Sequence, residues 1–243
     1  MKENKYDEVS FFEQYGKMNR SLNGLDAAGE WHVLKEMLPN FDGKKVLDLG
    51  CGYGWHCRYA IENGAISVIG IDISEKMLEK AKQVNQLDGI KYKQIALEDA
   101  QFANGMFDVI ISSLTFHYIQ SYDVLIGKIY QWLKPRGKFV FSVEHPVFTA
   151  EGSQDWIYNE AGSKLHWAVD RYFYEGQRNT SFLGENVLKY HRTVSTYLNE
   201  LLKQGFKIIE VKEPIPNETM LKNIPEMEDE LRRPMMFLIS VEK

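Results

Sequence analysis

Three glycines and one acidic residue have the spacing of a nucleoside site. Gly50, Gly52 and Gly54 follow a short apolar run, and glycines let a ligand approach the backbone closely. Asp72 ends a second apolar run about 20 residues on, the spacing of an acid that binds ribose hydroxyls. Trp55 replaces the last glycine of a dinucleotide fingerprint, and the residues of a phosphate loop are absent. The pattern therefore predicts a nucleoside without a 5′ phosphate; a plain strand–helix turn with a solvated acid is the alternative.

Alternating strands and helices are needed to hold these residues in one crevice. Strands that are apolar along most of their length are typical of a parallel sheet covered by helices on both faces. Right-handed crossovers then favour a doubly wound sheet, which binds ligands at the carboxyl ends of its strands. The predicted strands are 45–49, 66–71, 90–95, 107–113, 138–144, 207–211 and 235–241, and the predicted helices are 26–38, 55–63, 74–86, 122–133 and 193–204.

Residues 145–189 interrupt this alternation and show no clear period. The aromatic residues of this segment are Phe148, Trp156, Tyr158, Trp167, Tyr172, Phe173, Tyr174 and Phe182. Aromatics at this density suit an enclosed pocket or, through cation–π contact, a cationic amine. Packing of the segment onto the sheet explains them equally well. Its basic residues are balanced by acidic ones, so an RNA path over it is not favoured.

The glycine turn belongs to an ordered set of motifs. Residues 46–54 (VLDLGCGYG) and 70–74 (GIDIS) resemble the first two motifs of class I S-adenosylmethionine-dependent methyltransferases of the type 11 kind. Residues 97–100 (LEDA), 107–108 (FD) and 134–137 (KPRG) resemble further landmarks in the same order. The resemblance covers roughly residues 40 to 145.

The resemblance implies a Rossmann-like α/β fold. Its sheet would be doubly wound and mostly parallel, with seven strands, an antiparallel last strand and an aromatic-rich insertion after the fifth strand. One methyltransferase domain would span 1–243, with an N-terminal helical lid at 1–40 and a substrate-covering insertion at 145–189. The implied cofactor is S-adenosylmethionine.

The resemblance also assigns cofactor-binding positions. They are Asp48, Gly50, Cys51, Gly52, Gly54, Asp72, Ile73, Met77, Leu97, Glu98, Asp99 and Ser112. Asp72 would hold the ribose hydroxyls, and Ile73 and Met77 would pack on the adenine. Many relatives have Asp where this chain has Ala96, so the polar adenine contact must fall to one of residues 97–99.

Residues 15–20 are the candidate lid over the cofactor. Related enzymes often close over the cofactor with residues that precede the first strand. Tyr15 or Arg20 could then pair with the cofactor's carboxylate, and a solvated surface charge is the alternative for Arg20.

Three histidines lie on segments expected near the crevice: His117 after the fourth strand, His145 after the fifth, and His191 at the end of the insertion. Methyl transfer from a sulfonium is an in-line displacement, and it needs a base only if the acceptor starts protonated. Each histidine is a candidate base or acceptor-orienting group. Packing beneath the cofactor is the alternative, and positioning alone would then carry the reaction.

Composition narrows the partners. The net charge of −5 argues against a nucleic-acid backbone as the main partner, and no apolar run is long enough for a membrane span. The N-terminus lacks the apolar stretch of a signal peptide, so we expect a cytoplasmic protein. We expect it to be a monomer or a homodimer. His56 and Cys57 point apart on a helix, so no metal is expected.

The leading hypothesis is methyl transfer to an oxygen or nitrogen atom of a small-molecule acceptor. An RNA or protein methyltransferase would need a basic or extended groove. A cofactor-binding regulatory protein without turnover is the non-enzymatic alternative.

Overall fold

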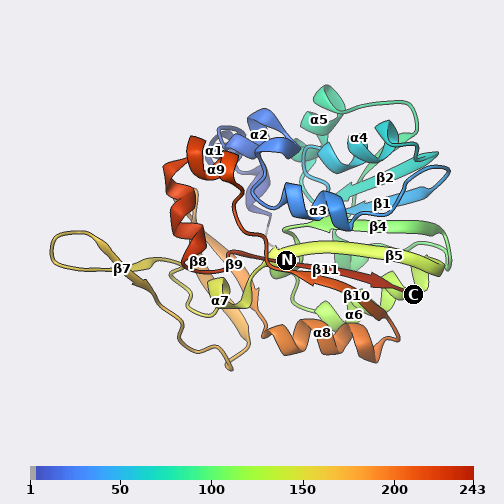
Figure 1. Ribbon diagram of the computed structural model, residues 1–243. Helices are drawn as coiled ribbons and strands as arrows, with labels where there is room; N and C mark the ends of the chain where they lie inside the picture. The colour runs from blue at the N-terminus through green and yellow to red at the C-terminus, as the bar shows by residue number, and fades with distance from the viewer. Residues whose placement is uncertain (1–3) are drawn as a thin grey trace.

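A seven-stranded sheet forms the centre of the computed structural model, which describes residues 4–243 (Figure 1). The strands lie in the order β10-β11-β5-β4-β1-β2-β3. Their bounds are β1 (Lys45–Leu49), β2 (Ser67–Asp72), β3 (Ile90–Gln94), β4 (Phe107–Ser113), β5 (Leu133–Glu144), β10 (Lys207–Lys212) and β11 (Met236–Glu242). Strand β11 is antiparallel to β5 and β10, while the pairs among β1 to β5 are parallel. The predicted doubly wound sheet with its antiparallel last strand is confirmed.

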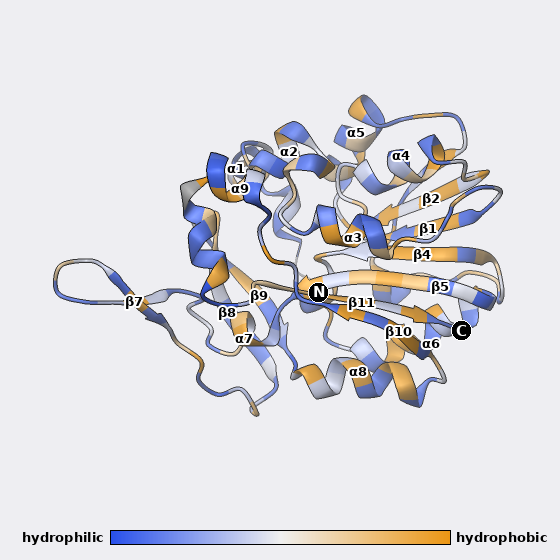
Figure 2. Ribbon diagram, viewed as in Figure 1, coloured by the Kyte–Doolittle hydropathy of each residue, from blue (hydrophilic) through white to orange (hydrophobic). Residues whose placement is uncertain are grey.

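Helices cover both faces of the sheet, as the apolar strands require. One face packs against α3 (Trp31–Met37), α4 (Trp55–Glu62) and α5 (Glu75–Val84), and the other against α6 (Tyr122–Trp132) and α8 (Val194–Lys203). Successive residues of β4 show the alternation, because Val109 and Ile111 pack under α4 and α5 while Ile110 packs toward α6. Figure 2 shows apolar residues concentrated in the central strands. No helix within residues 4–243 is long and apolar enough to cross a membrane.

Most predicted elements agree with the structure to within a few residues. The helix predicted over 26–38 is the exception: it is divided into a 3₁₀ turn, Leu25–Ala27, and α3. Strand β5 begins at Leu133, five residues before the predicted start at Lys138, because Leu133 pairs with Phe107 across an irregular register.

The N-terminal segment consists of short helices that lie over the carboxyl ends of the strands. They are η1 (Lys5–Asp7), α1 (Val9–Gly16) and α2 (Asn19–Asn23). Residues 1–3, where the predicted lid and domain begin, lie outside the described residues.

The segment after β5 contains regular structure that the sequence pattern did not reveal. It forms α7 (Pro146–Thr149), the hairpin of β6 (Trp156–Tyr158) and β7 (Lys164–Trp167), and the hairpin of β8 (Gly176–Phe182) and β9 (Glu185–His191). In Figure 1 the β6–β7 hairpin extends away from the sheet. Leu183 and Gly184 join β8 to β9 with φ of 54° and 82°. Two positive φ values mark a type I′ hairpin turn, which leucine rarely occupies, so the turn lacks its usual signal. The chain between β10 and β11 forms α9 (Glu218–Asn223) and η5 (Pro225–Leu231).

Asp48 is a buried carboxyl group within β1, directly beneath the glycine turn. Its side chain is 1% exposed, and its Oδ2 accepts a hydrogen bond from Cys57 Sγ at 3.2 Å. Within residues 4–243, Oδ1 has no hydrogen-bond partner. Burial raises the pKa of Asp48 to about 7. The carboxyl group therefore supports the turn as a largely neutral group in mildly acidic solution, and it is partly ionised at neutral pH.

Changing Asp48 to Asn should alter how stability depends on pH. The folded state binds the extra proton, so the free energy of unfolding falls as pH rises from about 4 to about 7. Asn has no charge to bury. The variant should therefore become more stable relative to the wild type as the pH rises. We expect this relative gain in unfolding free energy to be on the order of 2 kcal/mol between pH 5 and pH 8, measured by urea unfolding.

Asp108→Asn is the matched control for this experiment. The Asp108 carboxylate pairs with Lys134 Nζ at 2.8 Å, and the bonds from Lys134 and Lys45 hold its pKa below the usual value despite partial burial. Removing the Asp108 charge should therefore not stabilise the variant relative to the wild type at high pH. An equal difference at both pH values for Asp48→Asn would contradict the neutral buried carboxyl group.

Candidate active site

The glycine turn after β1 is shaped by close contacts on both sides of an open position. Gly50, Gly52 and Gly54 have φ of 72°, 50° and 78°. A Cβ on Gly50 would lie 2.3 Å from Thr115 Oγ1, and one on Gly54 would lie 2.2 Å from the Tyr92 hydroxyl oxygen. A Cβ on Gly52 would meet no atom within 4 Å. Gly50 and Gly54 therefore permit tight packing, whereas Gly52 leaves space in which a ligand can approach the backbone.

Asp72 connects the glycine turn to the following helix. Its Oδ2 accepts a hydrogen bond from Gly52 N and its Oδ1 from Ser74 N, both at 2.9 Å. Burial raises the pKa of Asp72 despite these bonds. Each carboxylate oxygen has a second lone pair, so the group can still accept one hydrogen bond on each oxygen, as two ribose hydroxyls require.

The N-terminal segment is fastened to this site through Asp7. The Asp7 Oδ1 accepts hydrogen bonds from Ser74 Oγ at 2.6 Å and from Lys76 N at 3.1 Å. Burial raises the pKa of Asp7, but the bonds from Ser74, Lys76 and Glu75 outweigh it and lower the pKa below its usual value. An ionised carboxylate at the start of α5 also suits the positive end of the helix dipole. Asp7 was missed from the sequence, because no local pattern links it to a helix almost 70 residues away.

Tyr15 and Arg20 both reach the glycine turn. Together with Gly50, Gly52 and Ser113 they line a cavity at the carboxyl ends of β1 and β4. The ring of Tyr15 lies 5.4 Å from that of Tyr6, whose hydroxyl donates to the Tyr118 hydroxyl at 3.3 Å.

The remaining positions predicted for the cofactor lie around the glycine turn, and the hydroxyl of one of them, Ser112, is directed into the sheet. Met77 is 2% exposed on α5, and Cys51 is 6% exposed within the turn. Ile73 is half-buried, and its carbonyl accepts from Gln94 Nε2 at 3.2 Å. Ser112 is fully buried and donates to Leu49 O at 2.7 Å, so its hydroxyl is used within the sheet. Because side chains alternate along a strand, Ser113 faces the cavity instead.

Residues 97–99 form a 3₁₀ turn at the carboxyl end of β3. Leu97 is 4% exposed and packs into the core, Glu98 is half-buried and Asp99 is exposed. Lys128 Nζ donates to Glu98 O at 2.7 Å and fixes the turn. Of the three, Leu97 has its side chain occupied by core packing.

These features fit S-adenosylmethionine. The open position at Gly52, the Asp72 carboxylate and the cation of Arg20 match the chemistry of a ribose and a methionine carboxylate. Within residues 4–243, no group of three His, Cys, Asp or Glu residues is arranged to hold a metal ion.

Both ring nitrogens of two of the three candidate histidines face groups of the chain itself. His145 Nδ1 accepts from Val147 N at 3.0 Å, and its Nε2 lies 2.8 Å from Glu213 Oε1 in an ion-pair contact. His191 Nδ1 pairs with Thr149 Oγ1 and its Nε2 with Tyr172 O, each at 2.8 Å. These contacts help to hold α7 and the insertion in place, so neither ring is directed toward a methyl acceptor.

His117 differs from the other two histidines. Its Nδ1 accepts from Glu144 N at 3.3 Å, and no other group within residues 4–243 makes a hydrogen bond to its Nε2. Burial lowers its pKa to about 4, so the ring is neutral at physiological pH. With Nδ1 as acceptor, Nε2 carries the proton and is a donor. The arrangement suits a group that orients an acceptor more than one that removes its proton.

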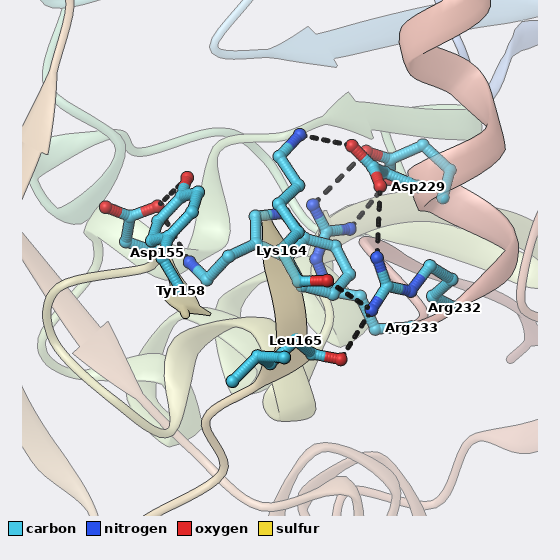
Figure 3. Close-up of polar contacts among 9 residues, drawn as sticks. Asp155, Tyr158, Lys164, Leu165, Asp229, Arg232 and Arg233 are labelled. Atoms are coloured by element: carbon cyan, nitrogen blue, oxygen red, sulfur yellow. Dashed lines mark hydrogen bonds and ion pairs between the residues drawn. The ribbon is translucent and has the colours of Figure 1, made fainter. Parts of the chain in front are cut away.

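The aromatic residues of the insertion surround a cation that the chain itself supplies. The Arg233 guanidinium carbon lies 4.7, 5.5 and 4.3 Å from the ring centroids of Phe148, Trp156 and Trp167. Figure 3 shows the neighbouring Arg232, which donates to Leu165 O at 2.7 Å. These contacts join the insertion to the segment before β11.

The other aromatics of the insertion are spread over its surface and edges. Tyr158, Phe173 and Tyr174 are 45%, 87% and 71% exposed. Tyr172 packs on His191, with the ring centroids 5.6 Å apart. Phe182 is the aromatic that faces the N-terminal segment, with its ring 5.9 Å from that of Phe11. Packing therefore accounts for most of the aromatic excess in this segment.

Comparisons with known proteins identify the family of this chain. A family model described as a methyltransferase domain matches residues 47–141. A solved structure provisionally named an S-adenosylmethionine-dependent methyltransferase, from Listeria monocytogenes, is 57% identical over 90% of this chain and 99% of its own, with a TM-score of 0.86. One named an S-adenosylmethionine-dependent methyltransferase, from Mesorhizobium loti, is 42% identical over 90% of this chain and 100% of its own, with a TM-score of 0.85.

Two curated relatives have names that state an acceptor. Phosphoethanolamine N-methyltransferase 3 of Arabidopsis thaliana is 32% identical over 53% of this chain and 26% of its own length. Malonyl-[acyl-carrier protein] O-methyltransferase of Pectobacterium atrosepticum is 29% identical over 51% of this chain and 47% of its own length. The chain thus spans about half or less of these two proteins. From its motifs, its fold and its full-length structural relatives, the chain belongs to the class I S-adenosylmethionine-dependent methyltransferases.

Proposed function

We propose that this enzyme transfers the methyl group of S-adenosylmethionine to an oxygen or nitrogen atom of a small-molecule acceptor. The observation that carries the proposal is the contact between the N-terminal segment and the insertion. The Phe11 ring, fully buried on α1, lies 5.9 Å from the Phe182 ring of β8, and Ser10 Oγ lies 3.4 Å from Glu185 Oε1. We infer that the described part of the lid, residues 4–40, and the insertion at 145–189 form one roof, which favours an acceptor small enough to be enclosed.

The cofactor is assigned to the glycine turn and the residues around it. Asp72 binds the ribose hydroxyls, and Gly50 and Gly52 admit the methionine and ribose portions to the backbone. Ile73 and Met77 pack on the adenine, while the backbone of residues 97–99 reads its polar edge. Arg20, with Tyr15 beside it, pairs with the cofactor's carboxylate. Cys51 lines the same cavity beside Gly50 and Gly52. Asp48, Gly54 and Ser112 support the turn and the adjacent strand from beneath.

The chain's own contribution to the reaction is positioning. When bound, S-adenosylmethionine supplies a methyl group on a positively charged sulfur, which is the electrophile. The roof excludes water, and the neutral His117 donates from Nε2 to the acceptor and turns its nucleophilic atom toward the methyl group. His145 and His191 hold α7 and the insertion in position. An acceptor whose attacking atom has a free lone pair and carries no proton that must leave first, such as a neutral amine or a carboxylate, then needs no protein base.

The relatives with stated acceptors support transfer to either element, and phosphoethanolamine is a small molecule. One is named for N-methylation of phosphoethanolamine and the other for O-methylation of a malonyl group on a carrier protein. The net charge of −5 and the roof argue against an RNA acceptor.

A panel of acceptors tests the proposed function. S-adenosylhomocysteine release should be measured with small primary and secondary amines, phenols and carboxylic acids, beside tRNA and an unfolded protein as macromolecular acceptors. We expect turnover on at least one small class and none on the macromolecules. Turnover on tRNA or protein alone would overturn the small-molecule proposal. Cofactor binding without turnover on any acceptor would favour a regulatory protein.

His117 should matter for turnover and not for cofactor binding. Losing one donor to the acceptor should lower kcat of His117→Ala roughly 10- to 100-fold, with the Kd for S-adenosylmethionine unchanged. Because the pKa of His117 is about 4, the wild-type kcat should show no inflection from this group between pH 6 and pH 9. The exposed His166 provides the control variant, His166→Ala. An unchanged kcat in His117→Ala would contradict the orienting role.

A further inference from the structure

Glu30 is a buried charged group with no part in the proposed chemistry. It lies at the start of α3, is 1% exposed, and its Oε1 accepts hydrogen bonds from Arg20 Nη2 and Ser113 Oγ, each at 3.0 Å. Burial raises the pKa of Glu30, but the Arg20 cation outweighs it, so the pKa lies below its usual value. The side chain is therefore an ionised carboxylate held between the lid and the end of β4.

The same contacts continue into the loop after β4. Ser113 Oγ accepts from Ser142 Oγ at 3.3 Å, and Ser142 Oγ accepts from Leu114 N at 3.1 Å. Leu114 has a φ of 51°, a conformation that a leucine adopts only under constraint from its surroundings. The chain of hydrogen bonds thus begins at Arg20 and ends where the backbone turns toward His117.

The geometry leaves two nitrogens of the Arg20 guanidinium available. Every hydrogen bond that Arg20 makes within residues 4–243 uses Nη2, which faces Glu30 and Ser113. The N–H groups of Nε and Nη1 are therefore unused, and each can donate to a carboxylate oxygen. Arg20 also lines the cavity beside Gly50 and Gly52. Because the guanidinium is planar and rigid, anchoring Nη2 restricts the directions in which these other N–H groups point.

We propose that Glu30 is a positioning residue, which holds Arg20 so that its unused N–H groups meet the carboxylate of the cofactor. This inference rests on the proposed role of Arg20. Glu30 contributes by lowering the cost of ordering a long side chain before the ligand arrives. Ser113 donates to the same Glu30 oxygen and so fixes the position of Glu30 relative to the end of β4.

Two probes separate the methionine end of the cofactor from its adenosine end. S-adenosylhomocysteine carries the carboxylate, whereas 5′-methylthioadenosine has the same adenosine and sulfur but no amino-acid portion. Their Kd values should be measured by calorimetry for the wild type, Glu30→Gln, Arg20→Met and the double variant. Glu62→Gln is the control, because Glu62 forms a half-exposed ion pair with Arg58 at 2.7 Å on the surface of α4.

We expect Glu30→Gln to weaken S-adenosylhomocysteine about tenfold and to leave 5′-methylthioadenosine within twofold. Arg20→Met should do the same. Because Glu30 acts through Arg20, the double variant should be no weaker than Arg20→Met alone. Glu62→Gln should change neither Kd.

Three results would overturn the inference. Equal weakening of both probes by Glu30→Gln would indicate a general structural effect, and additive losses in the double variant would indicate independent roles. An unchanged Kd for both probes would mean that Arg20 needs no anchor. A normal preference for S-adenosylhomocysteine in Arg20→Met would instead refute the proposed carboxylate contact itself. Should Glu30→Gln fail to fold, Glu30→Asp keeps the charge but shortens its reach, and it should lose part of the same preference.

Discussion

The carboxylate of Asp72 is the interaction on which the rest of the site depends. Its two oxygens bind the backbone of Gly52 and of Ser74, so that a single side chain joins the turn after β1 to the start of α5. Ser74 caps α5 by accepting from Met77 N at 3.1 Å, and it donates to Asp7 of the N-terminal segment. The position of the N-terminal segment is therefore fixed by contacts at the same end of the sheet as the glycine turn.

Buried charged side chains also hold the insertion and the loop after β4 in place. Lys189 on β9 is 2% exposed and pairs with Glu144 Oε1 at 2.6 Å, which ties the insertion to the end of β5. The Arg192 guanidinium donates to Gln120 O at 2.8 Å and to Phe116 O at 3.4 Å, and so holds the loop that carries His117. A buried ion pair is costly to break, because either partner alone would be left uncompensated. Lid, insertion and loop are thus held by polar contacts as well as by packing.

Sequence reasoning brought the glycine turn and Asp72 together, as the structure does, because their signals are local. A strand, a glycine turn and an acid about 20 residues later specify one crevice, and β4 agreed with its predicted bounds residue for residue. The misses came from long-range geometry. Ser113 faces the cavity while Ser112 does not, Asp7 and Glu30 gain their roles from distant partners, and no sequence pattern could show that the aromatics of the insertion enclose the chain's own Arg233.

Hydrogen–deuterium exchange can detect whether the N-terminal segment closes over a bound cofactor. Backbone exchange should be followed with and without saturating S-adenosylhomocysteine. We expect slower exchange, by about tenfold or more, in residues 5–24 together with the glycine turn at 50–54, because closure of the segment shields amides that otherwise open locally. Protection of 50–54 with unchanged exchange in 5–24 would contradict it, since the ligand would then bind without the lid.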